Sequence, residues 1–430
     1  MQASKALPSI KIFNYRFLLI EIALIFFCYL LMENIFSWLF IQNSIVIEYY
    51  EKISSIIIYM FMVYKLPSLK TTEKVYIGIF TLLMIKLMLE SLYEFGTAFQ
   101  EFTMFTVLYP VIFAFFIKYI CRIYDLDLLG FISKFYIITY IIFMLIYGRG
   151  FSFSLDTVVM DDYGPFSGDS RIIHANSILM MIIPFLWFLD KFFKEKKFSL
   201  LLPCIFCLVV IIIHQHRSVW SSAIIALGFY IITEVRANKK TIPFMLQVAV
   251  LATVVLIISY VFITALEPGF VNFLGDRFSE IFDPAKEGST GNFRIQQRET
   301  YFPMAMQKPI FGWTFKGFEM PNPLVDWWPA GTGQHFHEGY MEMLFYHGFV
   351  GLLFKYSILI YFLVKVWSKK ISSQTRILLA FSISGLLFSF NYVLPLIFWG
   401  HVGLCLYYID KDAANKTQNV QQLNSILSPL

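Results

Sequence analysis

Two arginines with helical spacing, Arg294 and Arg298, lie in the segment GNFRIQQRETYFPMAMQKPIFGW. The pattern predicts a helix over residues 293–308, on which side chains four residues apart share a face. Two guanidinium groups on one face near a membrane suit a diphosphate, because each can bind phosphate oxygens through two hydrogen bonds. A surface salt bridge to Glu299 or Asp283 is the alternative interpretation.

Two histidines, His335 and His337, occur in the segment GTGQHFHEGYMEML, between a Gly-Thr-Gly stretch and a long apolar run. Carboxylates at Glu338 and Glu342 could orient an imidazole so that it acts as a general base. We expect His337 to carry this role, because it lies at the first turn of the following helix, whereas His335 follows a flexible glycine-rich stretch. A zinc site formed by the HxHE string and a purely structural histidine are the alternatives.

A third arginine, Arg217, lies in HQHRSVW between apolar runs at residues 199–213 and 218–234. The first run covers only ~22 Å, short of the ~30 Å hydrocarbon core, so we expect the turn to lie below the outer membrane surface. An arginine at that depth is costly unless it meets an anion or a carboxylate. This cost favours a binding role over a snorkelling or structurally paired arginine. Arg171 and His174, in SGDSRIIHAN, either line the same region or cap the helix that follows.

The composition of the chain indicates what must position these residues. Of 430 residues, 58% are hydrophobic and only 15% are charged, whereas a soluble domain has about 45–50% apolar and about 25% charged residues. These values exclude an ordinary soluble enzyme. The mean hydropathy of +0.66 also excludes a disordered or disulfide-framed protein. The net charge of +5 comes from short basic clusters between apolar runs, which indicates membrane topology rather than nucleic-acid binding.

Apolar runs long enough for membrane helices predict an all-α polytopic membrane protein with about twelve spans. The runs lie at residues 17–40, 44–64, 75–93, 102–120, 128–147, 173–190, 199–213, 218–234, 242–265, 339–364, 376–391 and 394–409. Four parts follow from this layout. They are spans one to nine over 1–265 with an extracytoplasmic loop at 148–172, an extracytoplasmic loop subdomain over 266–338, spans ten to twelve over 339–409, and a loose cytoplasmic tail over 410–430.

The basic residues predict the orientation of the spans, because cytoplasmic loops carry an excess of lysine and arginine. With the first end inside, 22 of the 34 basic residues fall in cytoplasmic connections and their flanks. Outside the longest loop, only four basic residues fall on the far side. We therefore expect both termini in the cytoplasm and the arginines and histidines described above on the opposite side of the membrane.

The helix arginine and the loop histidine together resemble the O-antigen ligase and O-antigen polymerase family of bacterial envelope glycosyltransferases. In that family an arginine opens a helix that runs to a Pro-x-x-Gly turn, as Arg294 runs to Pro309–Gly312 here. A large outside loop then ends in a histidine, followed by a helix with a Gly-x-x-Gly motif, as His337 precedes Gly348–Gly351.

Arg217 is similar to the family's arginine near the outer end of a mid-chain span, and Arg171 to Asn176 looks like its Arg-to-Asn segment. The chain departs from the family pattern at two positions. Glu338 follows the histidine where the family usually has asparagine, and Arg298 stands where the family has an aromatic residue.

The resemblance implies a metal-independent, inverting glycosyltransferase of the GT-C type in the bacterial inner membrane, with no cofactor and an active site that faces the periplasm. The donor would be a glycan on undecaprenyl diphosphate. The acceptor would be a lipid A core sugar for a ligase, or another lipid-linked repeat unit for a polymerase. Arg217 and Arg294 would neutralise the diphosphate leaving group, and His337 would take the proton from the acceptor hydroxyl. Further substrate contacts would come from Arg171, Arg298, His335 and Glu338.

A transporter or flippase of an anionic lipid-linked saccharide is the alternative function, because it would also place arginines in the membrane. Such a protein would more naturally contain inverted repeats and broken midplane helices. The sequence contains no evident internal repeat, which favours the transferase. It does not distinguish a ligase from a polymerase.

Overall fold

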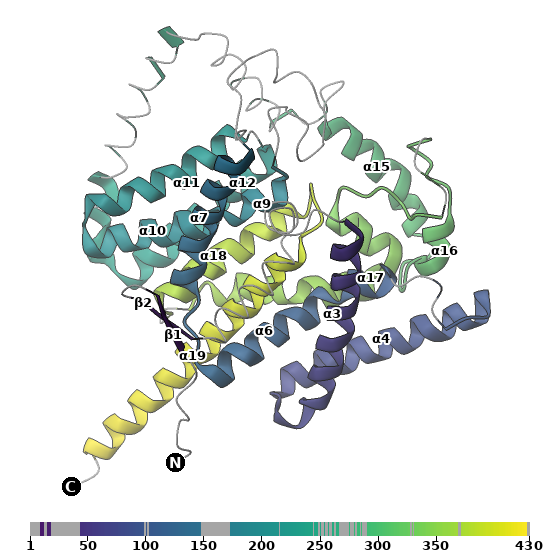
Figure 1. Ribbon diagram of the computed structural model, residues 1–430, viewed down its shortest axis with the longest axis horizontal. Coiled ribbons are helices and arrows are strands. Elements are labelled where there is room, and N and C mark those ends of the chain that lie inside the picture. Colours follow the sequence, from purple (N-terminus) through teal and green to yellow (C-terminus); the bar gives the residue numbers. More distant parts are fainter. Residues whose placement is uncertain are drawn as a thin grey trace.

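Helices make up most of the computed structural model (Figure 1). It describes residues 9–12, 15–18, 44–98, 100, 103–147, 173–214, 216–243, 245–247, 290–326, 329, 331–368 and 371–427, and isolated residues between 250 and 285. The helices are α3 (Ser44–Tyr64), α4 (Thr71–Phe95), α5 (Thr103–Leu108), α6 (Pro110–Tyr124), α7 (Leu129–Tyr147), α9 (Ala175–Met180), α10 (Ile182–Glu195), α11 (Leu201–Ile213), α12 (Arg217–Ala237), α15 (Thr290–Ala305), α16 (Thr314–Glu319), α17 (Gly339–Lys365), α18 (Ser373–Phe388) and α19 (Leu396–Leu427). Short 3-10 helices cover Leu66–Ser68, Phe198–Leu200 and Lys239–Thr241.

The helix bounds follow the predicted apolar runs closely, and local sequence signals set several ends. Helix α4 ends at Gly96, whose φ of 71° lets its N–H bond back to the Leu92 carbonyl. Helix α18 begins after Ser372, whose hydroxyl accepts a hydrogen bond from the Thr375 N–H at 3.3 Å. Among the described residues, four segments are long and apolar enough to cross a membrane: Thr71–Phe95, Ala175–Glu195, Arg217–Ala237 and Gly339–Lys365. The chain is thus a polytopic membrane protein, and the full set of twelve spans stays a prediction.

A short antiparallel hairpin near the beginning of the chain was not expected from the sequence. Its strands are β1 (Ser9–Ile12) and β2 (Tyr15–Leu18), with Ile12 paired to Tyr15. Ile10 and Ile12 alternate with Ser9 and Lys11 along β1, and Arg16 lies between two aromatic residues in β2, which favours an extended chain over a helix. Residues 17 and 18 of the first predicted span therefore lie in a strand, and its positions 19–40 lie outside the described residues.

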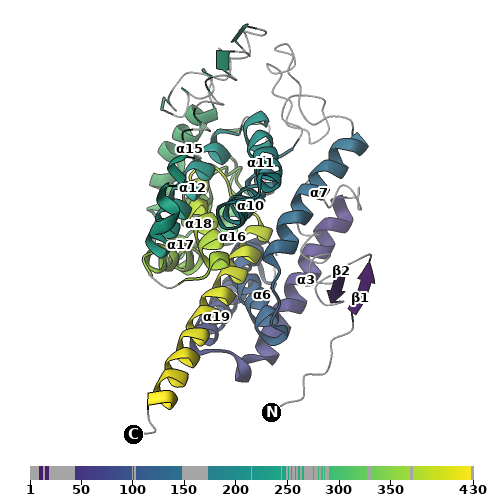
Figure 2. The ribbon, with the colours of Figure 1, turned by 90° about the vertical axis from the view of Figure 1, so that its left-hand side faces the viewer.

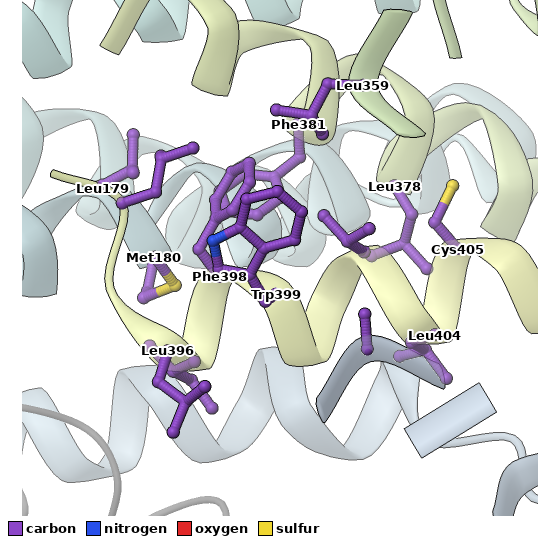
Figure 3. Close-up of a cluster of buried hydrophobic side chains, with 14 of the residues drawn as sticks. Leu179, Met180, Leu359, Leu378, Phe381, Leu396, Phe398, Trp399, Leu404 and Cys405 are labelled. Atoms are coloured by element: carbon purple, nitrogen blue, oxygen red, sulfur yellow. The ribbon is translucent and has the colours of Figure 1, made fainter. Parts of the chain in front are cut away.

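Helices α6, α12, α18 and α19 form the centre of the bundle, with α18 packed between α12 and α19 and α19 packed on α6. Phe381 of α18 and Phe398 of α19 lie with ring centroids 5.1 Å apart, beside the fully buried Trp399 (Figure 3). A Cβ atom added at Gly403 would lie 2.1 Å from the Ala114 carbonyl oxygen of α6. The small residue therefore allows the two helices to approach closely, as in many membrane bundles.

Ion pairs join helix ends that the sequence predicts to lie on the same side of the membrane. The Lys118 ammonium lies 3.0 Å from Glu73 and 2.9 Å from Asp410, so it joins α4, α6 and α19. Arg376 of α18 lies 2.6 Å from Glu234 at the end of α12. These pairs agree with a common side for the connections concerned; the assignment of that side to the cytoplasm stays a prediction.

The chain after residue 410 was expected to be loose, and this expectation is wrong, because α19 continues to Leu427. Residues 411–427 contain neither glycine nor proline and are rich in residues that tolerate a helix. The Asp412 carboxylate also accepts hydrogen bonds from the Ser372 N–H and the Thr375 hydroxyl of the neighbouring helix start. The last turns of α19 project beyond the other helices (Figure 2).

Candidate active site

One face of α15 carries the candidate arginines and lies beside α17 (Figure 1). The predicted helix over 293–308 is observed as Thr290–Ala305, three residues earlier at each end. Phe293, Arg294, Gln297 and Arg298 share this face, because their spacings of three and four residues match the helical repeat.

A tight turn after α15 packs on a kink in α17. At Gly348 the backbone leaves the helical region, with φ of 60° and ψ of −161°. The Phe349 and Val350 N–H groups then donate to the carbonyls of Pro309 and Ile310, at 2.8 and 3.1 Å. The Pro-x-x-Gly turn and the first glycine of the Gly-x-x-Gly motif are thus in direct backbone contact, which fixes α15 relative to α17.

The loop before the histidines is held in place, although the sequence suggested that it is flexible. The Gln334 N–H donates to the Tyr346 hydroxyl at 2.7 Å, and its side-chain amide donates to the Gly317 and Met320 carbonyls. The Tyr301 hydroxyl of α15 donates to Gln334 Oε1 at 2.9 Å. These bonds leave His335 on a defined backbone.

His337 lies between α15 and the start of α17. Its ring makes an edge contact with Phe293, at 5.7 Å between centroids, and lies 4.6 Å from the His335 ring. Burial, and then the positive charges of His335, Arg294 and His174, lower the pKa of His337 from 6.5 to about 4. The imidazole is therefore neutral near neutral pH and able to accept a proton or a hydrogen bond.

The carboxylate expected to orient His337 is engaged elsewhere. Glu338 Oε1 lies 2.6 Å from Arg298 Nη2, and Glu338 Oε2 accepts a hydrogen bond from Arg298 Nε at 2.8 Å. Within the described ranges, no carboxylate bonds to the His337 ring. The ion pair expected for Arg298 exists, but its partner is Glu338 rather than Glu299 or Asp283. Burial raises the pKa of Glu338, and the charge of Arg298 opposes this shift.

Arg294 differs from Arg298 in its surroundings. Its guanidinium lies over the Tyr392 ring, 5.2 Å from the centroid. Tyr392 in turn contacts the ring of His174 at 5.6 Å, so a residue from the earlier loop reaches the same place. In the part of the chain that the structure describes, Arg294 forms no ion pair, and its Nε atom is buried without a hydrogen-bond partner. This geometry leaves a cation in position to bind an anion.

Arg217 is the first residue of α12, after the short helix α11, as the sequence predicted. Its neighbour His216 hydrogen-bonds to the Ile173 carbonyl at 2.7 Å, which ties the start of α12 to the residue before His174. Arg217 is thus connected through the backbone to the contacts around His174. Arg171 lies outside the described residues.

Residues 202–356 match a family model described as O-antigen ligase. This part of the chain is similar to the O-antigen ligase family. No curated protein matches the chain. The match supports a glycosyltransferase-type role in lipopolysaccharide or other polysaccharide assembly, and the resemblance inferred from the sequence is confirmed.

The matched region, residues 202–356, contains Arg217, Arg294 and His337, together with Arg298, His335 and Glu338. His174 and Tyr392 lie outside the matched residues but complete the surroundings of Arg294 and His337. Across the described ranges, no three His, Cys, Asp or Glu side chains form a group that could hold a metal ion.

Sequence reasoning missed two residues of the O-antigen ligase site. Gln297 lies one turn from Arg294, so its helical spacing could have identified it. Tyr392 follows α18 in a stretch, NYVLP, that carries no functional signal in the sequence. Only the fold places its ring under the arginine.

Proposed function

We propose that this protein is a metal-independent, inverting glycosyltransferase of the extracytoplasmic face of the bacterial inner membrane. It transfers a glycan from undecaprenyl diphosphate to a lipid A core sugar or to another lipid-linked repeat unit. The observation that carries the proposal is the pairing of two groups: Arg294, a stacked cation without a carboxylate partner among the described residues, and His337, a histidine kept neutral by burial. The O-antigen ligase match supports the same chemistry.

The proposed role of Arg294, together with Arg217, is to bind the diphosphate of the donor. The Tyr392 ring holds the guanidinium in place by a cation–π contact, and a planar guanidinium can donate two parallel hydrogen bonds to phosphate oxygens. Negative charge grows on the diphosphate as the bond to the sugar breaks. Cations already in place stabilise that charge without reorganisation.

His337 is proposed to act on the acceptor. The acceptor hydroxyl oxygen attacks the anomeric carbon, the bond between that carbon and the diphosphate oxygen breaks, and the hydroxyl proton passes to the neutral imidazole. The diphosphate leaves with the electron pair of the broken bond. A single displacement of this kind inverts the configuration at the anomeric carbon.

Arg298, Glu338, His335 and Arg171 are proposed as further substrate contacts with lesser roles. Arg298 and Glu338 already bind each other, so the pair would shape the acceptor side through the exposed part of Arg298. Arg298 is 46% exposed, whereas Glu338 is 3% exposed, which makes Arg298 the more accessible of the two.

The test is a transfer assay with purified protein in lipid nanodiscs, a synthetic undecaprenyl-diphosphate glycan and candidate acceptors. We expect a new glycosidic bond with inverted configuration, and strong loss of product from Arg294→Lys, because lysine keeps the charge but loses the two-point contact. Arg298→Lys, on the same helix face, is the matched control and should lose less. Full product from both Arg217→Ala and Arg294→Ala would refute the donor site. Movement of the lipid across the bilayer without a new bond would instead identify a flippase.

A further inference from the structure

Gln297 is a buried polar side chain, 1% exposed, on the α15 face between Arg294 and Arg298. Its amide nitrogen donates a hydrogen bond to the His335 carbonyl. Its amide oxygen accepts a hydrogen bond from the His337 N–H at 3.4 Å. One side chain therefore holds the backbone on both sides of Phe336.

The direction of these two bonds is determined by the chemistry of the partners. A backbone carbonyl only accepts a hydrogen bond, and a backbone N–H only donates one. The clamp, which consists of the two hydrogen bonds from Gln297 to the His335 and His337 backbone, therefore needs a side chain with both a donor and an acceptor at its end. Glutamine fits this requirement, whereas a carboxylate of the same shape has no hydrogen to donate. The Gln297 side chain therefore fits the backbone of residues 335–337 both in its hydrogen-bonding groups and in its length.

The segment that Gln297 holds places its side chains on opposite sides. Phe336 packs on the buried rings of Tyr301 and Phe345, with centroids 4.7 and 5.3 Å away. The rings of His335 and His337 lie together on the other side, 4.6 Å apart. A twist of this short backbone would move the His337 ring away from its contact with Phe293.

Arg294 and Gln297 lie one helical turn apart on the same rigid helix. The helix that presents the cation to the donor therefore also sets the position of the histidine. We infer that Gln297 is a positioning residue for glycan transfer, which fixes the His337 backbone relative to Arg294; this inference rests on the proposed function. Gln297 itself touches neither substrate nor reacting atoms.

The variant that tests this inference is Gln297→Glu, which keeps the shape of the side chain but removes its donor. Gln296→Glu is the matched control, because Gln296 is the neighbouring residue on the same helix but is exposed. For Gln297→Glu we expect kcat to fall by about 10–100-fold, as for a small misplacement of a reacting group. Binding of the undecaprenyl-diphosphate donor should keep its wild-type affinity in Gln297→Asn, which shortens the reach of the amide without adding a charge beside Arg294.

A second measurement does not depend on catalysis. Hydrogen–deuterium exchange followed by mass spectrometry should show faster exchange in the peptide that contains residues 335–338 in Gln297→Glu, and unchanged exchange there in Gln296→Glu. If Gln297→Glu does not fold, Gln297→Asn, which keeps the amide but shortens its reach, replaces it with the same expected outcomes.

The outcomes separate the clamp from the proposed function. Wild-type kcat in Gln297→Glu, or equal losses in the two glutamate variants, would overturn the inference. A parallel loss of donor affinity and kcat in the neutral variant Gln297→Asn would also overturn it, because Gln297 would then belong to the donor site. If wild-type protein transfers no glycan, the proposed function fails. In that case faster exchange in Gln297→Glu would still support the clamp, and unchanged exchange would refute it.

Discussion

Arg298 and Glu338 form a two-point ion pair between α15 and the start of α17, with Nη2 to Oε1 at 2.6 Å and Nε to Oε2 at 2.8 Å. These are the two positions at which the chain departs from the family pattern seen in the sequence. The two residues by which this chain differs from the pattern that the resemblance implies therefore bind each other in the fold. Glu338 is buried, so it depends on this partner for its charge.

The ion pair predicts non-additive effects on stability. Arg298→Gln leaves the buried Glu338 carboxylate without its cation, so it should destabilise the protein more than the double variant Arg298→Gln with Glu338→Gln. The coupling energy of such neighbours is about 0.5–3 kcal/mol, and screening at the half-exposed Arg298 favours the lower part of that range. Thermal unfolding of the two single variants and the double variant in one detergent measures it. Additive shifts in Tm would show that the pair contributes no coupling.

The contact between the turn after α15 and the kink in α17 predicts that replacing Gly312 or Gly348 by alanine destabilises the protein. A Cβ atom at Gly348 would lie 2.4 Å from the Ile310 carbonyl carbon, and one at Gly312 would lie 2.4 Å from the Tyr346 carbonyl carbon. Both glycines also have a positive φ, which disfavours alanine. Each alanine variant should be destabilised by about 1–3 kcal/mol, measured by thermal unfolding.

The control for this prediction is Gly78→Ala in α4, where an added Cβ would meet nothing within 4 Å. This variant should unfold at or above the wild-type temperature, because alanine favours a helix. Equal effects at Gly78 and Gly348 would show that the backbone contact between the turn and the kink carries no stability.

Apolar periodicity predicted most helices correctly, because burial in a membrane requires long apolar runs whose ends are marked by glycine, serine or basic residues. It could not predict that α19 continues to Leu427, since a polar helix there depends on contacts such as Asp412 with Ser372. The hairpin before Leu18 was missed because its strands are only four residues long.

The candidate site shows the same division between local pattern and tertiary contact. Helical spacing was enough to place Arg294 and Arg298 on one face. It could not show that Arg298 is bound by Glu338 while Arg294 stacks on Tyr392, because both partners are distant in the sequence and are brought near only by the fold.

The lowered pKa of His337 predicts how activity depends on pH. The reaction needs the neutral imidazole, so activity should persist below pH 6.5 and be lost only as pH approaches about 4. His335→Gln removes one of the positive charges that lower this pKa, so the pKa of His337 should rise and the acid limb should move to higher pH. The dependence of kcat/KM on pH in both proteins measures the shift. An acid limb that is identical in the two proteins would contradict the assignment to His337.

The orientation predicts which surface cysteines react from outside. In a background without the five native cysteines, Glu299→Cys in α15 should react with a membrane-impermeant thiol reagent in intact spheroplasts. Lys196→Cys, at the end of α10, should react only after permeabilisation. Both native side chains are exposed, so access to either position is limited by the membrane alone. The reverse labelling pattern would invert the topology.

Replacement of His337 and of His335 should reduce glycan transfer to different extents. General-base assistance contributes about 10²–10⁴-fold, so His337→Ala should reduce glycan transfer by that order while the donor lipid still binds to Arg217 and Arg294. His335→Ala should reduce transfer much less, because the His335 ring lies beside the proposed base and influences it mainly through charge.

Product formation and donor binding are measured on the same purified preparations of both histidine variants, with and without a chelator. We expect transfer to resist the chelator, since the two arginines supply the positive charge that a metal would bring. Equal, mild losses at both histidines would indicate a structural role, and restoration of a His337 variant or of chelated protein by zinc would replace the general base with a metal site.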